Sequence, residues 1–159
     1  MKNKRYKLVG VSGTFSPPLH SGHVTLISKA FEISEQVMIG LTTDEMTRHK
    51  TLNEKIPSYE IRKKNIIDFL TKKNLINRTI IIKLTDPYGP SIEDQGLEAI
   101  IVSTDTRYMD ENINRKRKEK NLPPLDFVTI DMVLAKDGNP ISSTRMRQGI
   151  IDEKGNLNK

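Results

Sequence analysis

The sequence predicts an α/β fold: a Rossmann-like, open, parallel sheet of five strands with helices on both faces. Five short apolar runs recur along the chain, and segments with helical spacing or composition separate most of them. Strands of a parallel sheet are covered on both faces, so they read as continuous apolar runs rather than alternating ones. The length of 159 residues is typical of one domain, and we expect a single domain over 1–159.

The first elements are a strand, a helix and a second strand. Tyr6–Ser12 is a short apolar run bounded by Gly13, which predicts a buried strand. Apolar residues then recur at helical spacing, which predicts a helix from about Gly22 to Ser34. The run Gln36–Thr42 predicts the second strand.

Two helices and a third strand are expected next. A short helix follows the second strand, with Thr43 or Asp44 as its cap. Ser58 is a suitable N-cap for a longer helix, in which Ile66 and its apolar neighbours share one face. The β-branched run Arg78–Leu84 predicts the third strand.

The second half repeats the pattern. Prolines and a glycine predict a loop over 86–91, which is either a simple turn or a wall of a binding site. The later elements are a strand over Leu97–Ser103, a polar helix over 106–120, a strand over 126–134, a final helix that begins near Ser142, and a mobile tail over 152–159.

Composition restricts the class of protein. Lys and Arg number 26 against 20 Asp and Glu, which gives a net charge of +6 and fits anionic partners such as nucleotides, nucleic acid or acidic membrane surfaces. The chain has no cysteine, which excludes disulfides and thiolate metal sites. No apolar run reaches the length that spans a bilayer, so we expect a cytoplasmic protein with no membrane partner.

The stretch GTFSPPLHSGH follows the first predicted strand and opens the first helix. His20 and His23 therefore lie at the carboxyl end of a strand and at a helix N-terminus, where open α/β sheets bind ligands and where backbone N–H groups favour anions. Gly22 allows close approach of the backbone to a phosphate, and Thr14 offers a hydroxyl. We expect no metal site here, because the two histidines have no obvious third ligand.

A second stretch, ISSTRMR, has the same context. It follows the last strand and opens the last helix, and in a parallel sheet both stretches face the same edge. Ser142, Ser143 and Thr144 supply hydroxyls, and Arg145 and Arg147 are suited to gripping phosphate.

The two motifs together, H-x-G-H and I-S-S-T-x-x-R about 120 residues later, resemble the nucleotidyltransferase superfamily that uses an adenylate or cytidylate donor. The stretches GLTTDEMTRHK, SYEIR, DPYGPSIEDQGLEAIIVS and INRKRKEKNLPPL are similar to phosphopantetheine adenylyltransferases of the archaeal and eukaryotic type. The similarity runs from about Lys7 to Leu157. It implies transfer of the adenylyl group of ATP to 4′-phosphopantetheine, which gives dephospho-coenzyme A and pyrophosphate.

The resemblance also implies roles for single residues. Thr14 would bridge the acceptor phosphate and the α-phosphate, and Lys50 would reach the reacting phosphates. His20, Gly22 and His23 would hold ATP phosphates, with His23, Lys50 and Thr14 as the catalytic set. Ser142, Ser143, Thr144 and Arg147 would complete the ATP site, and Mg²⁺ would arrive bound to the triphosphate. Asn114 and Arg117 match the family's IN-x-x-R stretch, whose task the sequence does not give.

Two departures from the family pattern are visible. The first motif usually reads G-T-F-D-x-L-H-x-G-H, whereas here Ser16 replaces the aspartate and the turn is one residue longer. The family's SEET after the fourth strand reads STDT, so that Asp105 replaces a glutamate.

Alternatives stay open at this stage. A nicotinamide mononucleotide adenylyltransferase or a glycerol-phosphate cytidylyltransferase would share both motifs. The basic run Arg115–Lys120 fits a nucleic-acid-binding module or a solvated helix face, but aromatic residues are few, so we expect no nucleic-acid partner. Arg62 fits either a surface charge or a residue that supports the site. The sequence leaves the oligomeric state open.

Overall fold

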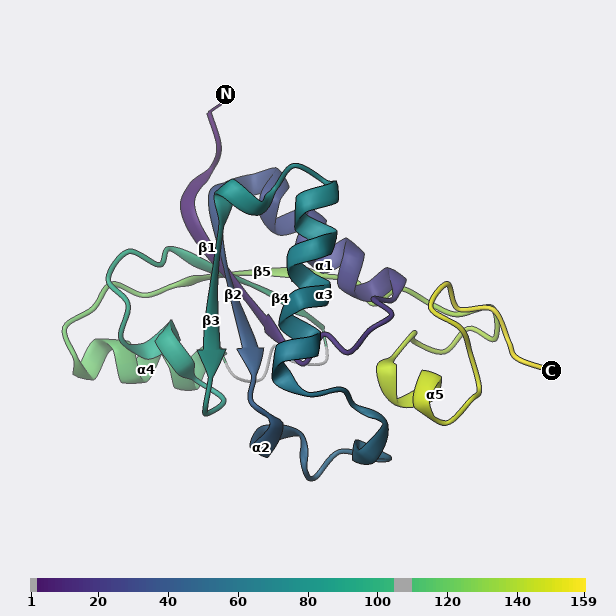
Figure 1. The fold of residues 1–159 in the computed structure, drawn as a ribbon. Helices are drawn as coiled ribbons and strands as arrows, with labels where there is room; N and C mark the ends of the chain where they lie inside the picture. The colour runs from purple at the N-terminus through teal and green to yellow at the C-terminus, as the bar shows by residue number, and fades with distance from the viewer. Residues whose placement is uncertain (1–2, 105–109) are drawn as a thin grey trace.

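The computed structural model describes residues 3–104 and 110–159, and over these residues it contains one sheet of five parallel strands (Figure 1). The strands are β1 (Tyr6–Gly13), β2 (Ser34–Thr42), β3 (Thr79–Leu84), β4 (Ala99–Ser103) and β5 (Asp126–Ile130). Their spatial order is β3-β2-β1-β4-β5, and every neighbouring pair is parallel. The predicted open, five-stranded parallel sheet is confirmed.

Helices cover both faces of this sheet, as predicted. Figure 1 shows α1 (Ser21–Ile33) and α3 (Tyr59–Lys72) on one side and α4 (Asp110–Glu119) on the other. The shorter helices are α2 (Asp44–Thr47), α5 (Ser143–Arg147) and the 3₁₀ turns η1 (Asn53–Lys55), η2 (Ile76–Arg78) and η3 (Gly89–Ile92). None of the helices in the described part of the chain is long and apolar enough to cross a membrane.

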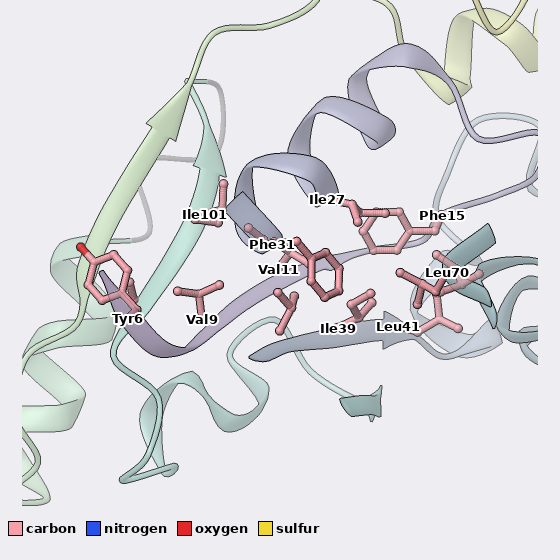
Figure 2. Close-up of a cluster of buried hydrophobic side chains, with 14 of the residues drawn as sticks. Tyr6, Val9, Val11, Phe15, Ile27, Phe31, Ile39, Leu41, Leu70 and Ile101 are labelled. Atoms are coloured by element: carbon pink, nitrogen blue, oxygen red, sulfur yellow. The ribbon is translucent and has the colours of Figure 1, made fainter. Parts of the chain in front are cut away.

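The main core lies between the sheet and the α1–α3 layer (Figure 2). Alternate residues of each strand face it, such as Val11 of β1 and Ile39 of β2, because successive side chains of a strand point to opposite faces. Helix α1 contributes Ile27 and Phe31, which are four residues apart and therefore lie on one helix face. Burial of each such side chain contributes roughly 1.5–3 kcal/mol.

Three strand ends differ from the predictions by two residues or more, and one of them is the start of β4, which lies at Ala99 rather than at Leu97. The fifth strand was expected to run to Leu134 but ends at Ile130, which pairs with Ser103, the last residue of β4. In the described part of the chain β4 is the sheet neighbour of β5, so the ladder ends where β4 ends. Leu134 instead forms an isolated antiparallel bridge with Pro140. At the other end, β2 begins at Ser34 directly after α1, two residues earlier than predicted.

The sheet reverses its order at β1. The chain builds β2 and β3 on one side of β1 and then crosses to place β4 and β5 on the other side. In an open α/β sheet, a ligand crevice forms outside the carboxyl ends of the strands at such a switch point. The residues that follow β1 are therefore positioned at this crevice.

The segment for which the sequence predicts a mobile tail is packed in the structure. Lys136 N donates to Gly155 O at 2.9 Å, and Ile151 forms an antiparallel bridge with Leu157. Ser21 N, at the start of α1, donates to Glu153 O at 3.0 Å. The C-terminal segment is thereby attached both to the turn before α5 and to the first turn of α1.

We predict that Gly155→Ala lowers the free energy of unfolding more than Gly138→Ala does. Both glycines have left-handed backbone, with φ of +85° and +82°, so alanine costs about 1–2 kcal/mol at either position. At Gly155 a Cβ would also lie 2.9 Å from the Ala135 Cα, whereas at Gly138 it would meet nothing within 4 Å. The clash adds about 1–3 kcal/mol. Urea unfolding measures the difference, and equal losses would contradict the packing of this segment.

Candidate functional site

Two histidines cap the first helix reciprocally. His20 is the N-cap of α1, and its Nδ1 accepts a hydrogen bond from His23 N at 3.2 Å. In return, His23 Nδ1 accepts from His20 N at 3.4 Å. The two rings stack with their centroids 3.6 Å apart. This arrangement is a capping box in which imidazoles replace the usual hydroxyl and carboxylate groups.

The capping bonds decide which ring nitrogen carries the proton. Each Nδ1 is an acceptor, so the proton of each neutral imidazole is on Nε2, which can donate to a ligand. Burial lowers the pKa of His20 to about 4. The pKa of His23 is lowered to about 3, mainly by burial and in smaller part by the positive charge of a protonated His20. Both rings are therefore neutral Nε2–H donors near pH 7.

Gly22 makes room for the ring of His20. A Cβ at this position would lie 2.8 Å from the His20 Cε1 and 3.0 Å from its Nδ1. The sequence suggested only that this glycine lets a phosphate approach the backbone. The structure adds a second reason for it, because any side chain here would displace the capping imidazole.

The turn before the histidines contains the departures from the family motif. Phe15 has a left-handed φ of +48° and is buried, and its ring lies against that of His23 with the centroids 5.1 Å apart. Ser16, at the position of the family aspartate, is also buried, and the Pro17–Pro18 peptide bond is cis. The other departure, Asp105, lies outside the described residues.

Thr14 is attached to two neighbouring segments. Its hydroxyl oxygen accepts a hydrogen bond from the Thr42 hydroxyl at 3.0 Å, and its carbonyl accepts one from Arg62 Nη1 at 3.0 Å. Arg62 also donates to Pro57 O at 2.9 Å and to Asp44 Oδ1 at 3.0 Å. The turn after β1 is thus attached to β2, to α2 and to the start of α3.

Arg62 supports the site and is not a surface charge. Its side chain is 0% exposed, and this burial decides between the two roles that the sequence allows. A signal was present, since Arg62 precedes Ile66 by four residues and Leu70 by eight, which places it on the apolar face of α3. A buried arginine requires acceptors for its donors, and here they are the carbonyls of Thr14 and Pro57 and the carboxylate of Asp44, which is itself exposed.

The second motif opens α5 and makes contacts of its own. Ser142 is the N-cap, and its hydroxyl accepts from Arg145 N at 3.2 Å. Arg147 Nη2 donates to the Thr144 hydroxyl at 3.2 Å. Arg145, which the sequence suggested for phosphate binding, is instead paired with Asp137 and donates to Pro140 O at 3.0 Å. Its guanidinium therefore holds the turn before α5.

Lys50 lies among other cations. Burial lowers the pKa of its ammonium group, and the positive charges of Arg147 and Arg62 lower it further. The loop that carries Lys50 is attached to α5, because Arg147 Nε donates to Thr51 O at 2.9 Å and Lys55 Nζ donates to Arg147 O at 3.0 Å. An anion bound among these groups would relieve their mutual repulsion.

A cavity of about 390 Å³ separates the first motif from the second. Its lining includes residues of the first motif turn, residues of the second, and both basic and acidic side chains: Ser16, Pro17, Ser143, Arg147, Lys55, Asp152 and Glu153. The structure therefore brings together both motif turns and the loop of Lys50, which are far apart in sequence. His49, the third histidine, is exposed in that loop.

An apolar cavity of about 190 Å³ lies on the α4 side of the sheet. Gly10 and Gly40 leave a hollow on this face, and the cavity reaches Ser12 and Ser103 at the carboxyl ends of β1 and β4. Among the described residues, every one that lines it is uncharged. Pro87, Tyr88 and Pro90 form part of its wall, so the 86–91 loop contributes to a cavity and is more than a turn.

Over residues 3–104 and 110–159, no cluster of three or more His, Asp or Glu residues could hold a metal ion. The Nδ1 atoms of His20 and His23 are occupied by backbone N–H groups.

We predict that the free energy of unfolding falls as the pH is lowered from about 6.5 to 5. In this range the unfolded histidines bind protons with a pKa near 6.5, whereas native His20 and His23 titrate at about 4 and about 3. The unfolded state binds more protons, so the slope approaches about 1.4 kcal/mol per pH unit for each histidine. Above pH 6.5 this contribution is fully retained.

Urea unfolding at several pH values measures this slope. A His20→Gln/His23→Gln variant keeps oxygen acceptors for the capping bonds but cannot titrate, so its slope is expected to flatten. His49→Gln is the matched control and is expected to keep the slope of the parent protein. A parent protein without a slope above pH 5 would contradict the assignment of two buried neutral histidines.

Comparison with known proteins places this arrangement in a family. Residues 11–149 match the family model described as cytidylyltransferase-like. The chain is 42% identical to a phosphopantetheine adenylyltransferase of Methanothermobacter thermautotrophicus, over 98% of this chain and 92% of the relative. It is 44% identical to one of Pyrococcus horikoshii, over 96% of each chain.

Solved structures agree with the fold. A protein with unknown function from Archaeoglobus fulgidus superposes with a TM-score of 0.68 at 32% identity, over 79% of this chain and 89% of that one. A bifunctional NMN adenylyltransferase/ADP ribose pyrophosphatase from Francisella tularensis gives 0.60 at 18% identity, over 90% of this chain and 41% of that one, which supports the fold alone. The chain belongs to the phosphopantetheine adenylyltransferase family, within the cytidylyltransferase-like nucleotidyltransferases.

Proposed function

We propose that this chain transfers the adenylyl group of ATP to 4′-phosphopantetheine and releases dephospho-coenzyme A and pyrophosphate. The observation that carries the proposal is the convergence of the two motif turns on one cavity, with Arg147 at its wall and the Lys50 loop attached beside it. The curated relatives at 42–44% identity bear the name of this activity.

The chemical step needs no covalent enzyme intermediate. A phosphate oxygen of 4′-phosphopantetheine attacks the α-phosphorus of ATP, a new P–O bond forms, and the bond to the bridging α–β oxygen breaks. Pyrophosphate leaves with the electron pair of that bond. The acceptor is already an anion, so the enzyme has to align two anions and stabilise the developing negative charge.

The proposed roles follow the geometry. The Nε2–H groups of His20 and His23 donate to ATP phosphate oxygens, and the neutral rings require no proton transfer. Lys50 and Arg147 supply positive charge at the reacting and leaving phosphates. We assign the hydroxyls of Ser142, Ser143 and Thr144, at the start of α5, to the β- and γ-phosphates. We assign Thr14, which directly follows β1, to the position between donor and acceptor.

The apolar cavity is our proposed site for the pantetheine arm. It begins at the carboxyl ends of β1 and β4, at the same edge of the sheet as the phosphate-binding turns. Its uncharged lining matches a neutral arm. An acceptor phosphate at Thr14 could then have its arm directed along the α4 face of the sheet.

We also propose that Mg²⁺ enters with the triphosphate and is held mainly by phosphate oxygens and water. The lack of a metal-binding cluster in the described residues supports this arrangement. When bound, the ion neutralises part of the negative charge of the phosphates.

Pyrophosphate release by the purified chain tests the assignment. ATP or CTP with Mg²⁺ is combined with 4′-phosphopantetheine, nicotinamide mononucleotide or glycerol 3-phosphate. We expect turnover only with ATP and 4′-phosphopantetheine. Turnover with another acceptor, or no turnover with any, would overturn the proposed substrate.

We predict that His23→Ala lowers kcat by about 10²–10³-fold and changes the KM for ATP much less. A donor that strengthens its bond as charge develops contributes mainly in the transition state, so its loss appears in kcat. His49→Ala is the matched control, because it removes the exposed third histidine, and we expect it to retain parent kinetics. Steady-state kinetics of folded variants measures both constants. An unchanged kcat for His23→Ala would refute the role.

A further inference from the structure

Arg117 is buried, although the neighbouring basic residues Arg115 and Lys118 of the same helix are exposed. The sequence allowed the run 115–120 to be a solvated helix face, and Arg115, Lys118 and Lys120 are indeed exposed. Arg117, however, is 1% exposed. The arginine of the IN-x-x-R stretch therefore makes its contacts inside the protein rather than on its surface.

The guanidinium of Arg117 binds three backbone carbonyls from two loops. Its Nε donates to Pro123 O at 2.7 Å, in the loop before β5. Its Nη1 donates to Ser91 O at 2.8 Å and to Asp94 O at 3.0 Å, in and just after η3. A planar guanidinium can serve two loops at once because its donors point in fixed, divergent directions.

One of the two loops that Arg117 binds, the η3 segment, forms part of the wall of the apolar cavity. Tyr88, Pro90 and Ser91 of the η3 segment line the cavity, and so does Ile113 of α4. Lys116 adds a second contact, with its Nζ 5.1 Å from the centre of the Tyr88 ring. Asn114 binds both backbone groups of Leu125, at 3.1 Å and 2.8 Å, which holds the loop before β5.

The η3 segment depends on these contacts for its position. It is a single short 3₁₀ turn, and such turns have little stability of their own. Without the guanidinium, the carbonyls of Ser91 and Asp94 would lose a charged donor in a buried place, which favours their movement toward solvent. The wall of the cavity would move with them.

We propose that Arg117 is a positioning residue for the acceptor, which holds η3 against α4 so that the cavity for the pantetheine arm is preformed. Arg117 does not line the cavity and acts through Ser91 and its neighbours. The inference rests on the proposed function, because it assumes that the arm occupies this cavity. Its signature is a change in acceptor binding without a change in ATP binding, since the ATP motifs follow β1 and β5.

The test compares Arg117→Met and Arg117→Lys with Arg115→Met as the matched control on the same helix. Parent protein is assayed first with ATP and 4′-phosphopantetheine. If the parent shows no turnover, the proposed function fails, and this inference fails with it. For each variant we measure the two KM values, kcat, the Kd for ATP by calorimetry, and amide hydrogen exchange over residues 88–94.

We expect Arg117→Met to raise the KM for 4′-phosphopantetheine at least tenfold and to accelerate exchange over 88–94, while the Kd for ATP stays within twofold. Arg117→Lys keeps the positive charge but loses the planar arrangement of donors, so its KM for 4′-phosphopantetheine should lie between that of Arg117→Met and that of the parent protein. If Arg117→Met does not fold, the test is the KM for 4′-phosphopantetheine of Arg117→Lys and its amide hydrogen exchange over residues 88–94, each compared with the parent protein. Arg115→Met should match the parent.

Two results would overturn the inference while the proposed function stands. One is an active Arg117 variant whose KM for 4′-phosphopantetheine and exchange over 88–94 are those of the parent. The other is a parallel rise in the acceptor KM and the ATP Kd, accompanied by faster exchange throughout the chain. That pattern would show a general loss of stability rather than a positioned cavity wall.

Discussion

Strand β1 is hydrogen-bonded on both sides, to β2 and to β4, and the rest of the site depends on this double pairing. Because the strands are parallel, their carboxyl ends lie at one edge, and the change of direction at β1 opens a crevice there. The turn after β1 delivers Thr14 and the two histidines to that crevice. The turn after β5 delivers the second motif through a chain path that the docked C-terminal segment holds in place.

Two buried arginines organise the loops around this crevice. Arg62 joins the turn after β1 to α2 and α3, and Arg117 joins η3 to the loop before β5. Most of their acceptors are backbone carbonyls of irregular segments. Such carbonyls have no hydrogen-bond partner from a strand ladder or a helix and need another donor. A guanidinium suits this task because it offers five donors in a rigid plane and stays charged when buried. Irregular backbone is thereby fixed without regular secondary structure.

The charge distribution divides the site into two regions. On the side of the two motif turns, Lys50 is close enough to Arg147 and Arg62 for their charges to lower its pKa, whereas the two histidines stay neutral and cap α1 through hydrogen bonds. On the α4 side, the described residues that line the cavity are uncharged. A substrate with a charged end and a neutral arm matches both regions, and its binding would relieve the repulsion among the cations.

The sequence by itself determined the five parallel strands, the two motif turns and their common edge, because apolar runs and helix-capping residues act over short distances. It could not determine that β5 stops at Ile130, since that depends on where the neighbouring β4 ends. It also could not separate Arg117 from the exposed Arg115, or assign Arg145 to Asp137 rather than to a ligand. The burial of Arg117 and the pairing of Arg145 depend on carbonyls and carboxylates that only the tertiary structure brings within hydrogen-bonding distance. A charged side chain can be buried only where such partners surround it, and their positions are not visible in the sequence.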